Sequence, residues 1–389
     1  MIENYRYKKR TPYYWGMAGV LVLVFAMAVQ SSYVLDAKDK ERLQSITTPA
    51  AGKVASVHSG VEKTSKVFST PIKKVTKHEP ITLTFTGDVL LDKSVGEAIK
   101  KYGVDYPFAK VASLYKQADI AAVNLETSVS TRGSAANKQF TFRSRPETVK
   151  GLSRNGVDVV SLANNHANDY GHVALLDTIG YLDKAGIGHT GAGKDEKSAY
   201  SAYYNTVKGK RIAILGISRV LPEVSWYAGK NRPGIAQGYT TQPMMSYVKT
   251  AVKNSDYTII MIHWNRERQD YPESYARQMG KMFVDAGVDA VIGSHSHTIM
   301  GMELQQKKPI LYSLGNHVFT NSSDPRGKES LIVKLTLDNG KVSTQIIPAK
   351  ISNGQPRLMD KSYNQSIYNK LNRISYGVRI NRAGVASSR

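Results

Sequence analysis

Histidines stand directly after three runs of residues that are typical of buried β-strands. They are His166 after 157–162, His263 after 257–262, and His295 and His297 after 288–292. In an α/β protein the carboxyl ends of neighbouring strands share one edge of the sheet, and ligands bind at that edge. Neutral imidazoles are among the commonest metal ligands in proteins. The pattern therefore predicts a metal site at the strand ends.

Oxygen-bearing side chains follow the same strands and their neighbours. They are Asp88 after 81–85, Asn124 and Glu126 at the end of 120–124, Asn165 beside His166, and Asn316 and His317 after 310–314. A shell of oxygen and imidazole ligands suits Mn²⁺, Zn²⁺ or Fe better than Mg²⁺ or Ca²⁺. His295 and His297 would face one side of an extended backbone, so both could reach metal. Bound metal would acidify water, and His166 could protonate a leaving oxygen.

The elements that must position these residues alternate along the chain between about residues 80 and 350. Predicted strands lie at 81–85, 120–124, 157–162, 212–217, 257–262, 288–292, 310–314 and 331–337, and predicted helices at 146–154, 173–184, 244–253 and 272–285. Such alternation indicates an α/β domain whose central strands are largely parallel. Six of the strand ends carry polar residues, which predicts that these residues converge in one cleft.

The N-terminus predicts attachment to a membrane. Basic residues within 1–12 precede an apolar segment, 13–35, that is long enough to span a bilayer as an uncleaved signal anchor. The basic flank should stay in the cytoplasm, which places the remainder of the chain outside the cell. The alternative is a cleaved signal peptide, because 26–28 reads Ala-Met-Ala.

Two further segments lack a core-forming pattern. Residues 36–79 are rich in Lys, Ser, Thr, Val and Ala, and we expect a flexible basic stalk. The stalk is either a solvated linker or an arm that binds a polyanion. Residues 351–389 are expected to form a basic C-terminal tail, with only a weak helical signal near 363–371.

The charge of the chain favours anionic partners. The 53 Lys and Arg residues outnumber the 31 Asp and Glu residues, which gives a formal net charge of +22. Nucleic acid, anionic lipid, wall polymers and acidic polypeptides are all compatible with such an excess. Nucleic acid is not expected, because the basic residues are dispersed and no known reader motif is present. The absence of cysteine excludes disulfides, thiolate metal sites and cysteine nucleophiles.

Over about residues 80 to 350 the chain resembles the CapA-type poly-γ-glutamate capsule proteins of the calcineurin-like metallophosphatase superfamily. The matching motifs are Gly87-Asp88-Val89, Asn124-Leu125-Glu126, Asn164-Asn165-His166 with the residues to Gly171, His263-Trp264, His295-x-His297 and Ser313-Leu314-Gly315-Asn316. The resemblance implies a four-layer sandwich of two β-sheets flanked by helices, and one or two divalent metal ions. It implies as metal ligands Asp88, Glu126, Asn165, His263, His295 and His297, with His166 as the catalytic residue.

The motifs also depart from the broader phosphatases, which begin with Asp-x-His where this chain reads Asp88-Val89-Leu90. Two functions follow from the pattern. The first is a membrane-anchored extracytoplasmic protein of capsule polymer synthesis or export, with a metal-dependent hydrolase-like cleft. The second is a non-catalytic accessory subunit that binds the anionic polymer. In both cases the implied partners are the membrane-bound capsule synthesis subunits and poly-γ-glutamate.

Overall fold

The computed structural model describes residues 79–389. The segments predicted for 1–12, for the membrane anchor at 13–35 and for nearly all of the stalk at 36–79 lie outside the described residues. Within 79–389, no helix is both long and apolar enough to cross a membrane.

The first of two large sheets in the described part of the chain has the order β18-β17-β16-β1-β2-β5-β6, and β15 pairs with β1. Its parallel strands are β1 (Ile81–Val89), β2 (Ile120–Leu125), β5 (Val159–Ser161), β6 (Gly188–Thr190) and β15 (Asn316–Val318). Its antiparallel strands are β16 (Glu329–Asp338), β17 (Lys341–Ser352) and β18 (Gln355–Leu358). The sequence therefore locates its central strands well, with ends that differ by a few residues.

The second sheet has the order β13-β14-β12-β11-β9-β8. Its parallel strands are β9 (Lys210–Ser218), β11 (Tyr257–His263), β12 (Ala290–Ser294) and β14 (Lys308–Leu311). Its antiparallel edge strands are β8 (Tyr203–Val207) and β13 (Met302–Gln305). Short two-stranded pairs are β3 (Ser128–Val129) with β4 (Arg143–Ser144), β7 (Ala192–Gly193) with β10 (Gly234–Ile235), and β19 (Val378–Ile380) with β20 (Ala386–Ser388).

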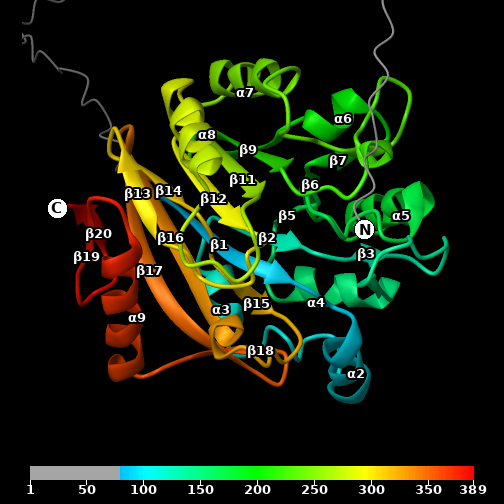
Figure 1. The fold of residues 1–389 in the computed structure, drawn as a ribbon, viewed down its shortest axis with the longest axis horizontal. Helices are drawn as coiled ribbons and strands as arrows, with labels where there is room; N and C mark the ends of the chain where they lie inside the picture. Colours follow the sequence, from blue (N-terminus) through cyan, green and yellow to red (C-terminus); the bar gives the residue numbers. More distant parts are fainter. Residues whose placement is uncertain (1–78) are drawn as a thin grey trace, which may run out of the picture. The chain divides into compact units, whose positions relative to one another are not determined.

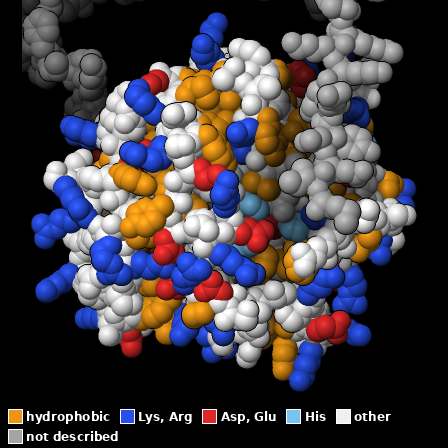
Figure 2. All heavy atoms as spheres, in the orientation of Figure 1, with side chains coloured by type: hydrophobic (Ala, Val, Ile, Leu, Met, Phe, Trp, Pro, Cys, Tyr) orange, Lys and Arg blue, Asp and Glu red, His pale blue; other side chains and the backbone are white. Residues whose placement is uncertain are grey.

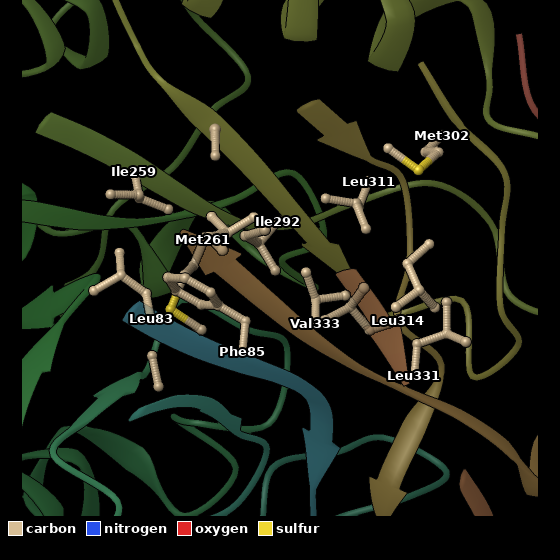
Figure 3. Packing of buried hydrophobic residues seen from close by; sticks show 14 of the residues in the cluster. Leu83, Phe85, Ile259, Met261, Ile292, Met302, Leu311, Leu314, Leu331 and Val333 are labelled. Atoms are coloured by element: carbon tan, nitrogen blue, oxygen red, sulfur yellow. The ribbon is translucent and has the colours of Figure 1, made fainter. Parts of the chain in front are cut away.

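The two sheets pack face to face, because alternate residues of each central strand point into the space between them. Phe85 of β1 and Met261 of β11 meet in this inner core (Figure 3). The intervening residues of the same strands are equally buried: Ile260 of β11, for example, packs on the outer face of the second sheet. Strands buried on both faces read as continuous apolar runs, which explains why the sequence revealed them.

Helices cover the outer faces of both sheets (Figure 1). Those on the first sheet are α2 (Lys93–Tyr102), α3 (Ala112–Lys116), α4 (Val149–Arg154) and α5 (Gly171–Lys184). Those on the second sheet are α6 (Glu196–Tyr200), α7 (Met244–Lys253) and α8 (Ser274–Asp285). The predicted α/β class is confirmed, and the layers follow the order helix, sheet, sheet, helix.

Aspartates set the register of the parallel strands at their amino ends. Each precedes one strand, and its carboxylate accepts a hydrogen bond from a backbone N–H of the neighbouring strand at 2.8 or 2.9 Å. These pairs satisfy backbone donors that would otherwise lack a partner. The pairs are Asp119 with Thr82, Asp158 with Ala121, Asp256 with Arg211, and Asp289 with Thr258.

The prediction that residues 351–389 form a basic C-terminal tail is wrong, because these residues belong to the folded unit. β18 extends the first sheet, and α9 (Lys361–Ile374) lies beside β17 (Figure 1). Tyr368 and Leu371 of α9 are buried in the inner core. The weak helical signal near 363–371 was the only sequence indication, since polar residues fill the other positions of the helix.

We expect Leu371→Ala to lower the free energy of unfolding by about 2–5 kcal/mol, because a buried leucine leaves a cavity when it is truncated. Leu358→Ala is the matched control: Leu358 is 46% exposed, whereas Leu371 is 1% exposed. The control should change stability by no more than about 0.5 kcal/mol. Urea unfolding followed by circular dichroism measures both. Equal effects of the two substitutions would contradict the placement of α9 in the core.

Candidate metal centre

The predicted site residues converge where the carboxyl edges of the two sheets meet. Three overlapping groups of side chains each bring one ligand atom per residue within 4.8 Å of the others. The groups are Glu126 with His263 and His295, Asp88 with Glu126 and His297, and Glu267 with His295 and His297. Figure 2 shows histidine at a hollow near the middle of one face, with acidic and basic side chains around it.

Glu126 is the most unusual member of the cluster. Its side chain is fully buried, and neither carboxylate oxygen has a hydrogen-bond partner within residues 79–389. The Nε2 atoms of His263, His297 and His166 lie 3.6, 3.9 and 4.0 Å from its Oε1. Burial and the nearby charge of Asp88 hold the pKa of Glu126 well above its usual range. Both oxygens are thus available to an additional ligand.

Asp88 is held in place from both sheets. Its Oδ1 accepts a hydrogen bond from Asn124 Nδ2 at 2.8 Å, and its Oδ2 accepts one from the backbone N–H of His295 at 3.3 Å. A Cβ atom on the preceding Gly87 would lie 1.8 Å from the carbonyl oxygen of Gly315. Only glycine therefore lets β1 approach closely enough to present Asp88. Asn124 orients this carboxylate, while Glu126 offers free oxygens.

The three clustered histidines differ in their expected protonation. Burial, reinforced by neighbouring histidines, holds the pKa values of His263 and His295 well below their ordinary range. Burial alone would also lower the pKa of His297, but the carboxylates of Glu126 and Asp88 raise it to about 10. His263 and His295 are therefore neutral and able to ligate at neutral pH. The Nδ1 atom of His295 is buried without a hydrogen-bond partner.

The backbone that carries His295 and His297 is not extended, as the sequence suggested it would be. β12 ends at Ser294, and the two histidines have φ angles of 95° and 55°. Non-glycine residues seldom adopt this left-handed region, and such strain concentrates at functional sites. The two imidazoles still converge, but a tight turn brings them together rather than strand alternation.

Asn165 and His166 lie beside the cluster on the loop after β5. Asn165 Oδ1 is 2.8 Å from His263 Nε2. His166 Nδ1 is 2.7 Å from an oxygen of Asp169, whose other oxygen accepts a hydrogen bond from Lys138 Nζ at 2.7 Å. Burial lowers the pKa of His166, although Asp169 partly offsets this effect. The opposite ring nitrogen, Nε2, faces the cluster.

Sequence reasoning missed Glu267 and Lys138 as members of the site. Glu267 is exposed and shares a cleft of about 450 Å³ with His166 and His297. The sequence signal for Glu267 was its place four residues after His263, whereas nothing in the sequence singled out Lys138. His317, which the sequence left undecided, is buried against Tyr115 and Ser330, with its ring nitrogens 2.6 and 3.0 Å from their hydroxyl oxygens.

We expect Asp169→Asn to lower the pKa of His166 further, because the carboxylate that favours the imidazolium is removed while burial remains. Two-dimensional NMR of the imidazole resonances across a pH titration of the metal-free protein measures this shift. Asp183→Asn is the control, since Asp183 contacts His189 and not His166. An unchanged or raised pKa of His166 in Asp169→Asn would contradict the assigned contact.

Comparison with known proteins identifies the family of this chain. The family model for the bacterial capsule synthesis protein PGA_cap matches residues 82–321. Capsule biosynthesis protein CapA of Bacillus anthracis is 29% identical over 344 residues, covering 86% of this chain and 82% of the relative. PGA biosynthesis protein CapA of Bacillus subtilis is 31% identical over 300 residues, covering 75% and 77%. A probable polyglutamine synthesis accessory protein of Mycobacterium tuberculosis is 30% identical over 289 residues, covering 67% and 74%. With its strand-end motifs inside the matched range, the chain belongs to the bacterial capsule synthesis protein family, and it is of the CapA type.

Proposed function

We propose that the protein acts in the synthesis or export of poly-γ-glutamate capsule polymer through a metal-dependent, hydrolase-like site. The relatives named for capsule and PGA biosynthesis support the polymer. The single observation that carries the chemistry is the buried Glu126 carboxylate, which has no hydrogen-bond partner and lies among three histidines. A buried carboxylate without a partner is costly unless a cation compensates it.

The donor set fits a divalent metal ion such as Mn²⁺, Zn²⁺ or Fe. The oxygens of Asp88 and Glu126 and the nitrogens of His263, His295 and His297 would hold it, with Asn165 beside His263. Mixed oxygen and imidazole shells suit these metals better than Mg²⁺ or Ca²⁺. The unpartnered Nδ1 of the buried His295 is a second orphaned donor that such an ion would satisfy.

The bound metal would polarise the substrate and acidify a water molecule. His166 would transfer the proton that the reaction requires. Asp169 accepts a hydrogen bond from Nδ1 of His166, which leaves Nε2 to exchange a proton with a substrate oxygen. The ring of Phe142 lies 4.2 Å from the His166 ring, centroid to centroid, and limits its rotation.

The proposal also includes location and partners. We infer that residues 13–35 anchor the protein in the cell membrane with its folded part outside the cell. There it would work beside membrane-bound synthesis subunits and meet the anionic polymer as it emerges. The long apolar segment with a basic flank supports this topology.

We expect the purified full-length protein to carry a divalent metal, and His295→Ala/His297→Ala to lose most of it, because two nitrogen donors are removed. Elemental analysis by mass spectrometry measures the metal per chain. His172→Ala serves as the control, since His172 lies on α5 outside the cluster. His166→Ala should retain the metal and abolish polymer cleavage. A metal-free wild-type protein that still supports polymer production would refute the catalytic proposal.

A second function, holding the polymer without cleaving it, is favoured by the charge of +22 and by the Lys and Arg side chains around the hollow in Figure 2. For this function we expect polymer binding to weaken steeply as salt rises from about 0.05 to 0.5 M. Binding should also survive His295→Ala/His297→Ala. Co-sedimentation with poly-γ-glutamate tests both expectations. Binding that is insensitive to salt would count against the accessory role.

A further inference from the structure

A second cleft, of about 410 Å³, adjoins the metal cluster on the side of β9 and β11. Its polar lining includes Lys138, Asn165, Arg219, Asn265 and Glu273. His263 connects this cleft to the metal cluster through two contacts. The backbone N–H of Arg219 donates to the carbonyl oxygen of His263 at 2.8 Å, and Asn165 Oδ1 lies 2.8 Å from His263 Nε2.

The guanidinium of Arg219 contacts two aromatic rings in this cleft and makes no hydrogen bond to the described residues. Its Cζ atom lies over two rings, 4.5 Å from the centroid of Tyr239 and 4.6 Å from that of Tyr275. Both rings are fixed, because their hydroxyl oxygens accept backbone hydrogen bonds from Leu221 at 2.9 Å and Asn265 at 2.8 Å. Among the described residues, no ion pair or side-chain hydrogen bond engages the guanidinium.

Asn265 supplies an independent observation. The residue is 5% exposed, and its Nδ2 is buried with no hydrogen-bond partner, while its Oδ1 accepts from the backbone N–H of Glu273 at 2.9 Å. A buried donor without an acceptor is destabilising, so an acceptor is expected to complete it. The acidic side chain in the cleft, Glu273, is paired with Arg266 at 3.1 Å.

We propose that this cleft is a subsite for an oxyanion, a carboxylate or a phosphate, carried by the substrate next to the group at the metal cluster. The planar guanidinium matches such groups with two parallel hydrogen bonds. Contact with the two rings orients it before the ligand arrives, which reduces the entropy lost on binding. Lys138 lines the cleft at its boundary with His166, but its ammonium is paired with Asp169 at 2.7 Å, so Arg219 carries the unpaired positive charge among the described residues that line the cleft. That a substrate group occupies the metal cluster beside this subsite rests on the proposed function, but anion binding at the subsite does not.

Isothermal titration calorimetry on the purified full-length protein tests the subsite with two probes, a γ-linked glutamate trimer and inorganic phosphate. We expect Arg219→Gln to weaken binding of the preferred probe about tenfold or more, since hydrogen bonds to charged groups are the strong ones. The affinity of Arg219→Lys for the preferred probe should fall between those of the wild type and Arg219→Gln. Lysine keeps the positive charge but cannot donate two parallel hydrogen bonds. Binding of the trimer alone would identify a carboxylate site, and binding of phosphate alone a phosphate site.

Arg211→Gln is the matched control. Arg211 lies near the start of β9, whereas Arg219 directly follows the end of that strand, and the Arg211 guanidinium also stacks on a tyrosine ring, 4.3 Å from the centroid of Tyr204. The Arg211→Gln variant should bind the probe with the affinity of the wild type. His295→Ala/His297→Ala should also bind the anion, which separates this subsite from the metal proposal. The subsite is overturned if the wild type binds neither probe, if Arg219→Gln binds as the wild type, or if Arg211→Gln is equally weakened.

Discussion

The arrangement of the cleft depends on the burial of Glu126, whose oxygens accept no hydrogen bond from the described residues. Moving a carboxylate out of water costs several kcal/mol even after the surroundings relax. The nearby carboxylate of Asp88 increases this cost. The two carboxylates in turn raise the pKa of His297 to about 10, although burial alone would lower it. Burial holds the pKa values of His263 and His295 low beside it, and Nδ1 of His295 has no hydrogen-bond partner among the described residues.

The two sheets that carry this cluster are held by close backbone contacts at both the amino and the carboxyl ends of their strands. At the amino ends, aspartates such as Asp119 bond the backbone of the neighbouring strand and set the register. At the carboxyl ends, the backbones approach so closely that a Cβ on Gly87 or Gly293 would lie about 2 Å from a carbonyl oxygen. Positive φ angles at His295 and His297 add strain. Burial of both faces of each sheet stabilises the fold enough to hold these features in place.

The sequence predicted the structure best where one pattern recurs, namely an apolar strand followed by polar residues. Apolar runs located the central strands, and the polar residues that end them identified Asp88, Glu126 and the histidines. The helix α9 was missed because its four buried residues are separated by polar ones, and a short amphipathic pattern resembles a solvated segment. Lys138 and Arg219 were missed for a different reason. Their roles come from contacts over long sequence separations, and a basic residue in a loop carries no periodic signal.

The departure at Asp88-Val89-Leu90 has a structural reason that bears on how the cleft can hold metal. Val89 and Leu90 are fully buried, and the backbone N–H of Leu90 donates to Val318 at 2.7 Å. Apolar packing therefore occupies both positions that follow Asp88, and neither side chain offers a ligand atom. Glu267, the remaining acidic group beside His295, comes from an exposed loop instead. The acidic groups of the cluster therefore differ in exposure: Asp88 and Glu126 are buried, whereas Glu267 is exposed to solvent.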